Sequence, residues 1–320
     1  MPPEQQNARP RGTSGVVARF LVGTRPIAVY GVGLEQSSRY FVSRLDAKYW
    51  EFQMELAAPK EGEDICYSRV LFVRQALSQA EEHLFALIFA FLQAPHCPDL
   101  WLYQYKTEDL VELINKVERS EDFLSRVKLT ENSWPAICKI LWPGLPEDRY
   151  RLTALILSRM ARHFVSPFGR DEYNSIKHGM RLDLGGQKIS FAHGTPDKLP
   201  DQKEYITLAD SMHGCRFWKF EKLHGKRQHL MAVRCFANWD FHYLGLLLAH
   251  ATLLIGNMGL AFRKRFGIDC NDEFNFITGT HAYEERFKED RGVVEGETRH
   301  ALDVSMNELV DLEEIVKQYI

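Results

Sequence analysis

Residues 171–181 combine titratable and amide side chains at a spacing that suits chemistry. Asn174 and His178 lie four positions apart, so on a helix their side chains share one face. Lys177 lies beside His178, and Arg181 follows within the next turn. A neutral imidazole can accept a proton from a hydroxyl group, and a nearby cation can stabilise the negative charge that develops in a transition state. We call Asn174, Lys177, His178 and Arg181 the polar stripe. This stripe predicts an acid–base site carried by one helix.

The same residues also fit a purely structural role at a helix end. Gly179 can adopt the left-handed conformation that closes a helix, and Lys177 and His178 suit the negative end of the helix dipole. Asn174 would then form a hydrogen bond with a neighbouring helix or with the turn at Gly185-Gly186. Under this interpretation the stripe fastens helices together or holds a homodimer, and the protein is a non-catalytic interaction or scaffold protein.

The segment Tyr173-Asn174-x-x-x-His178-Gly179 resembles the active-site helix of the HEPN family, small helical-bundle domains often found as metal-independent ribonucleases. The resemblance covers about residues 150–265. It implies an RNA-directed endoribonuclease that pairs as a homodimer across this helix. His178 would be the general base, and Asn174 would orient it or the phosphate.

The sequence departs from the family pattern at one position, because Tyr173 stands where the family has an arginine. A tyrosine has no positive charge and no guanidinium fork to bind a phosphate. Lys177, Arg181 or Arg170 would have to stabilise the transition state instead. The resemblance therefore implies either an altered ribonuclease or a domain that keeps the fold without catalysis.

A second candidate site collects positive charge on a predicted hairpin. The cations that we assign to nucleic-acid binding are Lys219, Lys222, Lys226 and Arg227, and they alternate with aromatic residues that could stack on bases, namely Phe217, Trp218 and Phe220. The simpler interpretation is a hairpin with a solvated basic side and a packed aromatic side. We favour this simpler interpretation.

Sequence patterns for metals and common cofactors are incomplete or missing. The six cysteines are scattered without a C-x-x-C pair, and the closest metal-like spacings, His96-Cys97 and His213-x-Cys215, lack a matching second half. The chain contains no phosphate-binding P-loop, H-E-x-x-H or G-x-S-x-G pattern. We therefore expect reduced, mostly buried thiols, no metal and no cofactor.

The hydrophobic periodicity predicts a mainly α protein, a helical bundle with an inserted β-hairpin or small sheet at about residues 187–238. Helices are expected at 35–56, 64–93, 107–119, 134–141, 146–166, 169–181 and from 240 onward. Segments 215–223 and 229–238 flank a turn and predict the hairpin, in which Met231, Val233, Cys235 and Ala237 share a face. We expect a flexible tail at 1–14, a single domain at 15–265 and a polar C-terminal extension at 266–320.

Residues 241–262 form the one segment with a membrane-like composition. They contain no Asp, Glu, Lys or Arg and precede three basic residues, but His242, His250 and Asn257 interrupt the apolar run. We interpret it as the core helix of a bundle rather than a membrane span. No secretory signal is present, so a cytoplasmic protein is expected. The net charge of −3 limits any RNA contact to a local patch.

Overall fold

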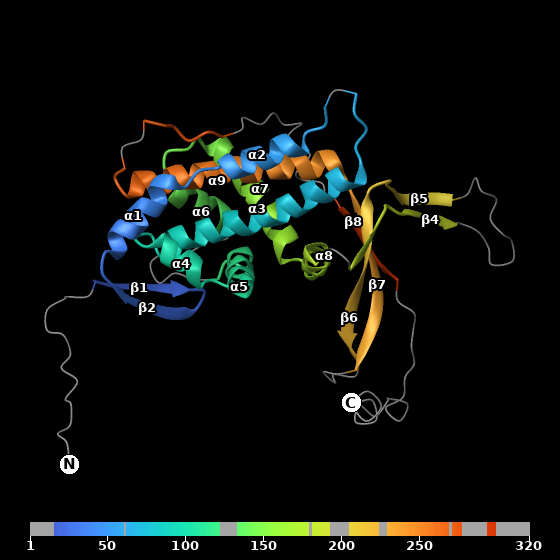
Figure 1. Cartoon of the computed structure of the whole chain (residues 1–320), viewed down its shortest axis with the longest axis horizontal. Coiled ribbons are helices and arrows are strands. Elements are labelled where there is room, and N and C mark those ends of the chain that lie inside the picture. Colours follow the sequence, from blue (N-terminus) through green and yellow to red (C-terminus); the bar gives the residue numbers. More distant parts are fainter. Residues whose placement is uncertain are drawn as a thin grey trace, which may run out of the picture. The chain divides into compact units, whose positions relative to one another are not determined.

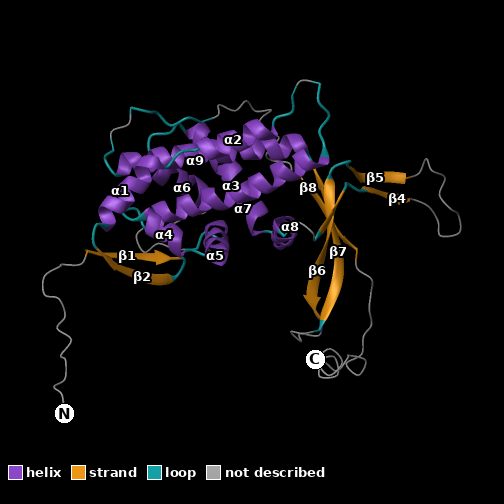
Figure 2. Ribbon diagram, in the orientation of Figure 1, coloured by secondary structure: helices purple, strands orange, loops and turns teal. Residues whose placement is uncertain are grey.

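The computed structural model describes residues 16–60, 62–121, 133–178, 181–192, 205–223, 229–268, 271–276 and 293–298. These residues form nine helices and eight short strands, all paired antiparallel (Figures 1 and 2). The expected fold class, mainly helical with a small β element, is confirmed.

The chain divides into two compact units, and neither is a continuous stretch of sequence. The first unit contains residues 1–55, 78–165 and 247–288, and the second contains 56–77, 166–246 and 289–320. The division passes through two long helices, α3 (Tyr67–Gln93) and α9 (Phe241–Arg265). A single domain over 15–265 stays a prediction, and the tail predicted at 1–14 lies outside the described residues.

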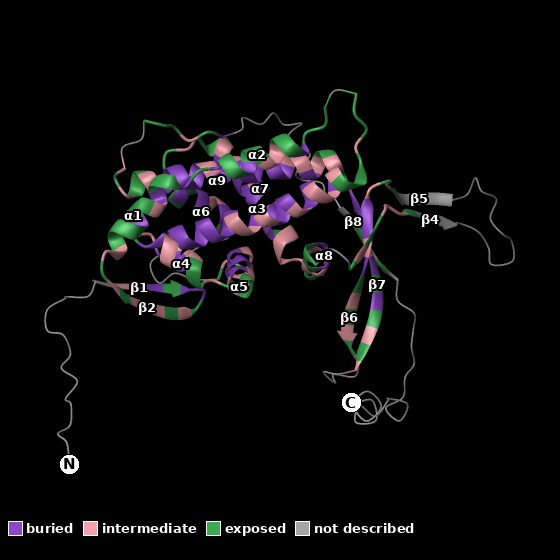
Figure 3. Ribbon diagram, viewed as in Figure 1, coloured by how far each residue is buried: buried purple, intermediate pink, exposed green. Residues whose placement is uncertain are grey.

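The first unit is a helical bundle with one hairpin. Besides the later parts of α3 and α9 it contains β1 (Val16–Val22), β2 (Arg25–Gly31), α1 (Leu34–Arg44), most of α2 (Lys48–Ala57), α4 (Pro98–Gln104), α5 (Thr107–Glu118), α6 (Ser133–Leu141) and α7 (Glu147–Val165). Residues 84–90 of α3 are buried at every position, so this helix is the centre of the core (Figure 3). A helix that is apolar on all sides must be surrounded by other elements.

The hairpin of this unit is fixed to the helices at its turn. Gly23 has a left-handed φ of 63°, and its amide donates to Gln93 Oε1 at 3.0 Å while its carbonyl accepts from Gln93 Nε2 at 2.9 Å. Trp101 Nε1 also donates to Gln93 Oε1, at 3.1 Å. One buried amide side chain therefore holds the turn against α3 and α4.

The helix predicted at 35–56 is interrupted, and the single-helix prediction was wrong in this detail. Its apolar spacing continues through the break, but Leu45 leaves the helical conformation with ψ at 111°. The Leu45 carbonyl instead accepts a hydrogen bond from Arg263 Nη1 of α9 at 2.8 Å. A tertiary contact thus ends α1, and α2 begins at Lys48.

Helix α9 is the one helix in the described part of the chain that is long and apolar enough to cross a membrane. Within the structure, 72% of its most apolar window is buried. Its buried polar residues include His250, Thr252 and Asn257, and the Asn257 side chain exchanges two hydrogen bonds with the backbone of Asn275, at 2.6 and 3.0 Å. These features support its interpretation as a core helix.

The second unit combines α8 (Pro167–Lys177) with two antiparallel sheets. A four-stranded sheet has the order β3-β6-β7-β8 and is formed by Leu182–Leu184, Gly214–Lys222, Leu230–Trp239 and Val293–Thr298. A second sheet pairs β4 (Lys188–Ala192) with β5 (Tyr205–Asp210). The predicted hairpin is confirmed, with Gly214 opposite Asn238 and Lys222 opposite Leu230. Strand β8 comes from the region predicted to be a polar extension.

Candidate nucleic-acid interface

Helix α8 carries the predicted catalytic stripe and has clear signals at both ends. Ser166 caps it by accepting a hydrogen bond from the Gly169 amide at 3.2 Å, and Pro167 occupies the first turn, where its missing N–H is tolerated. The helix ends at His178, whose amide donates to the Asn174 carbonyl at 3.2 Å. It therefore starts and stops slightly earlier than the predicted range of 169–181.

The two faces of α8 differ sharply in burial. Glu172, Ser175 and Ile176 are buried, whereas Asn174, Lys177 and His178 are all exposed. The structure thus brings these three predicted site residues together on the solvent side of one turn. Arg181 is also exposed, but it lies after the end of the helix. An exposed stripe is accessible to a ligand and is not packed against a neighbouring helix of its own unit.

The buried face of α8 contains a polar cluster that the sequence interpretation missed. The Arg74 guanidinium donates two hydrogen bonds to the Glu172 carboxylate, and Trp239 Nε1 donates to Glu172 Oε1 at 2.6 Å. All three side chains are buried. An acidic residue in the middle of a buried helix face was the signal for such a partner, but nothing in the sequence identified Arg74.

Hydrophobic contacts seat α8 on one face of the four-stranded sheet. Because side chains alternate along a strand, Cys215 and Phe217 of β6 lie on the same side as Cys235 and Ala237 of β7. All four are buried, and the rings of Phe217 and Phe168 are 5.2 Å apart. This is the packed face of the sheet. The shared face predicted for the second arm of the hairpin is confirmed.

Lys219 lies on this packed side, within a cluster of carboxylates. Its ammonium group is 3.1 Å from Glu221 and 3.1 Å from Glu297, and hydrogen bonds to both carboxylates raise its pKa. Burial raises the pKa of nearby Asp171, an effect that the positive charges of Lys219 and Arg170 only partly oppose. Lys219 is therefore engaged inside its own unit.

The opposite side of the sheet carries exposed aromatic residues. Trp218 is 55% exposed, Phe220 is 63% exposed, and Leu230 is also exposed. The favoured interpretation, in which the aromatic side is packed and the basic side solvated, was wrong. Since consecutive residues of a strand point to opposite faces, Phe217 is buried while Trp218 and Phe220 are exposed, and Lys219 is turned away from them.

Positive charge accompanies these aromatic residues. We call this surface the open sheet face and define it by Arg216, Trp218, Phe220, Lys222, Leu230 and Arg234. The Arg234 guanidinium lies over the Trp218 ring, 5.9 Å from its centre, and 3.8 Å from the Asp183 carboxylate. Arg216 Nε is shielded from solvent and has no hydrogen-bond partner among the described residues.

The four cations predicted to bind nucleic acid do not share one surface. Lys222 belongs to the open sheet face, whereas Lys219 points to the packed face. Lys226 and Arg227 lie outside the described residues. The sequence placed Arg234 among the positive residues of the hairpin but not among the binding residues, and Arg216 was not selected, although it is two residues from Trp218 on the same predicted strand.

Within the part of the chain that the structure describes, no group of three or more His, Cys, Asp or Glu side chains is placed to hold a metal ion. The sequence matches no protein-family model, and neither a curated protein nor a solved structure is significantly similar to it.

Proposed function

We propose that this protein binds single-stranded RNA through the open sheet face. The observation that carries the proposal is the exposed Trp218 ring with the Arg234 guanidinium beside it. An exposed aromatic ring can stack on any nucleic-acid base, because every base has a flat π-face. A cation near the ring attracts the phosphate backbone. Exposed apolar patches that are rimmed by polar residues often mark binding sites.

The spacing of the two rings suits an unpaired strand. Trp218 and Phe220 are two residues apart on β6, which corresponds to roughly 6–7 Å along the strand. Bases that stack on both rings must be separated from each other, as they are in single strands and loops. Lys222 and Arg216 lie on the same face and supply further positive charge for the backbone.

A second candidate function is metal-independent RNA cleavage, in line with the HEPN resemblance. The exposure of Asn174, Lys177 and His178 on one turn of α8 favours it. In this mechanism His178 takes the proton of a ribose 2′-hydroxyl, Asn174 orients the phosphate, and Lys177 or Arg181 stabilises the negative charge. Tyr173 replaces the family's arginine, so this activity depends on a substitute cation. A cytoplasmic homodimer is part of this proposal, and a non-catalytic scaffold is its alternative.

Binding is tested by fluorescence anisotropy with a labelled single-stranded RNA in EDTA. The variants Trp218→Ala and Phe220→Ala are expected to weaken binding. Tyr103→Ala is the matched control, because Tyr103 is 86% exposed but belongs to the other unit. Unchanged affinity in both sheet variants would reject the proposal. The same samples, run on a denaturing gel beside His178→Ala and Asn174→Ala, report cleavage.

A further inference from the structure

The outer side of α2 carries a row of exposed apolar side chains. Tyr49 is 56% exposed, Phe52 is 54% exposed and Leu56 is 53% exposed. Positions three and four apart on a helix share a face, so these side chains form one row along α2. Single exposed apolar residues are common on protein surfaces, but a patch with a polar rim is typical of an interaction site. We call this row the outer face of α2.

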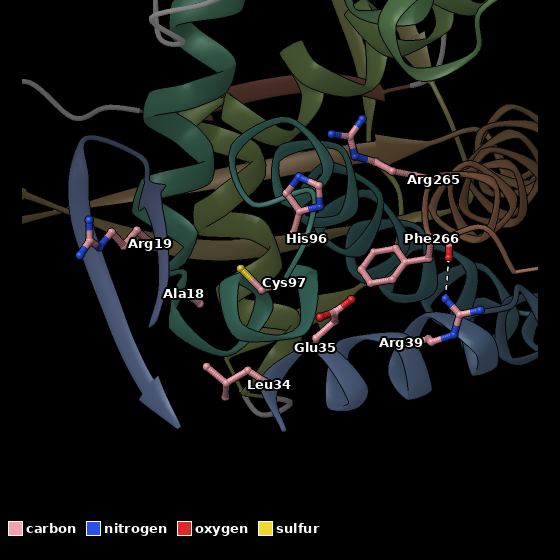
Figure 4. Close-up of a pocket in the computed structure, with 9 residues that line it drawn as sticks. All are labelled: Ala18, Arg19, Leu34, Glu35, Arg39, His96, Cys97, Arg265 and Phe266. Atoms are coloured by element: carbon pink, nitrogen blue, oxygen red, sulfur yellow. Dashed lines mark hydrogen bonds between the residues drawn. The ribbon is translucent and has the colours of Figure 1, made fainter. Parts of the chain in front are cut away.

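The opposite side of α2 holds the helix in place. Trp50 is buried, and its ring meets the His83 ring of α3 edge-on, with the ring centres 5.9 Å apart. The preceding helix, α1, is tied to the end of α9. In the pocket shown in Figure 4, Arg39 of α1 points to the Phe266 carbonyl and donates to it at 2.7 Å. The outer face is therefore presented by an anchored helix, which lowers the entropy lost on binding.

Charged residues flank the apolar row in a pattern that can pair with itself. Lys48 and Glu55 are seven positions apart, which is about two helical turns, so both lie along one edge of the row. They bear opposite charges, and both are exposed. The middle of this pair and the middle of Tyr49 and Leu56 both fall next to Phe52. The outer face is thus close to symmetric about Phe52, with opposite charges at the two ends of one edge.

We propose that two copies of this protein associate through the outer face of α2, with the two helices antiparallel. A two-fold axis beside Phe52 places the two Phe52 rings in contact and brings Tyr49 of each copy to Leu56 of the other. In an antiparallel pair the same edges of the two helices face each other, so Lys48 of each copy meets Glu55 of the other. A parallel pair would not bring these opposite charges together.

A short helix pair makes a small interface. Helix α2 has 10 residues and is about 15 Å long, so the paired faces bury less surface than a standard protein interface does. We therefore expect a weak dimer that forms as the concentration rises. The contact involves neither the open sheet face nor the polar stripe, so it is distinct from the homodimer that the HEPN resemblance implies.

A lipid surface is a poorer partner for this face than a second copy. Helices that lie on membranes are typically rich in basic residues on their polar side. Helix α2 has one lysine, Lys48, against two glutamates, Glu51 and Glu55. Its charges therefore suit its own antiparallel copy better than they suit an anionic membrane.

Sedimentation velocity of the full chain between about 10 µM and about 1 mM tests the contact. The parent protein is expected to pass from monomer to dimer over this range. Phe52→Ala should weaken the dimer by about tenfold or more, since Phe52 meets its own copy at the centre of the contact. Tyr103→Ala is the matched control, because Tyr103 is an aromatic residue of α4 that is 86% exposed.

Exchange of charges tests the antiparallel arrangement. Lys48→Glu and Glu55→Lys each place like charges opposite each other at both ends of the contact, so each should weaken the dimer about tenfold. With both substitutions in one chain the net charge stays at −3 and the attraction returns, so dimer affinity should recover. Each change puts a charge at the helix end that the dipole favours, so lost association would not reflect a lost helix. Arg151→Glu and Glu147→Lys, at exposed positions of α7, control for the altered net charge.

Three outcomes would overturn the dimer contact. The first is a parent protein that stays monomeric up to about 1 mM. The second is equal association of Phe52→Ala and Tyr103→Ala. The third is a dimer that responds to neither single charge change, or that the double exchange does not restore. Binding of the monomer to anionic lipid vesicles, if Phe52→Ala abolished it, would assign the outer face to a membrane instead.

Discussion

The Arg74 guanidinium and the Glu172 carboxylate form an ion pair in which the two side chains are 1% and 0% exposed. Trp239 Nε1 donates a third hydrogen bond to the same carboxylate. Charges are expensive to remove from water, so each partner is tolerated here only because the other is present. The pair joins α3, α8 and β7 within the second unit.

Glu172→Gln is expected to lower the free energy of unfolding by about 3–5 kcal/mol, because it leaves the Arg74 charge buried without its counter-ion. Urea denaturation followed by circular dichroism measures the change. Glu147→Gln is the control, since Glu147 is exposed and should alter stability by less than about 0.5 kcal/mol. Equal stability of the two variants would show that the buried pair contributes nothing.

The environment of Asp171 predicts a pH-dependent effect on stability. Burial raises the pKa of this carboxyl group, so the folded state holds the proton more tightly than the unfolded state does. Its stabilising contribution is therefore present at acidic pH and is lost as the pH rises through the folded-state pKa. Asp171→Asn stays neutral, so it should be more stable than the parent protein at pH 7.

Thermal unfolding of Asp171→Asn and the parent protein at about pH 7 and about pH 3 tests this pH dependence of stability. At the lower pH a normal aspartate is largely protonated, so the two proteins should carry the same charge at position 171. The stabilisation by Asp171→Asn should disappear at the acidic pH. Asp64→Asn is the comparison, since Asp64 is an exposed loop residue of the same unit. A constant stabilisation at both pH values would contradict the explanation.

The described cysteines should differ widely in reactivity. Burial raises the pKa of Cys97 and of Cys235 to about 11, and it raises the pKa of Cys138 and Cys215 further. Cys66 is exposed. Since the thiolate is the reactive form, brief iodoacetamide treatment of the native protein at pH 8 should modify Cys66 first.

Peptide mass spectrometry identifies the modified sites, and treatment in urea shows that every thiol can react once unfolded. Labelling of the native protein at Cys97 or Cys138 as fast as at Cys66 would show that the burial described here is not maintained in solution.

Salt dependence should separate stacking from charge on the open sheet face. Arg234→Gln and Lys222→Gln are each expected to reduce the slope of log affinity against log salt by about 0.7, the value for one phosphate contact of a single strand. Trp218→Ala should weaken binding by about 1–3 kcal/mol and leave the slope unchanged. Lys219→Gln, on the packed face, is the matched control. If Lys219→Gln changed the salt dependence of RNA affinity more than Arg234→Gln and Lys222→Gln do, the phosphate contacts would lie outside the open sheet face.

His178→Ala should change the free energy of unfolding by less than about 0.5 kcal/mol, because the side chain is exposed at the end of α8. If the protein cleaves RNA, this variant should lose activity while it keeps the fold, as judged by circular dichroism and melting temperature. A drop in stability comparable to that of Glu172→Gln would favour the structural role of the stripe.

Local patterns predicted the local parts of this protein well. Helical spacing placed Asn174 and His178 together, and strand alternation with a turn signal located the β6–β7 hairpin. The composition of β6 alone did not show which of its sides is packed, because Phe217 and Trp218 are consecutive aromatic residues. The apolar face predicted for β7 is the packed one, and Phe217 shares it by pairing with Cys235.

Relationships between distant segments escaped the sequence interpretation. Arg74 and Glu172 are 98 positions apart, and no spacing rule connects them. At the break after α1, the Leu45 carbonyl accepts a hydrogen bond from Arg263, which is 218 positions away. Such contacts are set by tertiary packing, which overrides a continuous helical pattern such as that of residues 35–56.

Strand β8 gives the sheet an unusual order of assembly. Trp239 of β7 pairs with Val293 of β8, so the whole of α9 is synthesised between the two partners. Until β8 arrives, β7 has an unpaired edge of backbone donors and acceptors, which is a template for pairing with another chain. A nascent or truncated chain without residues 293–298 would therefore be open to strand exchange between copies, and any shortened form of the protein should keep β8.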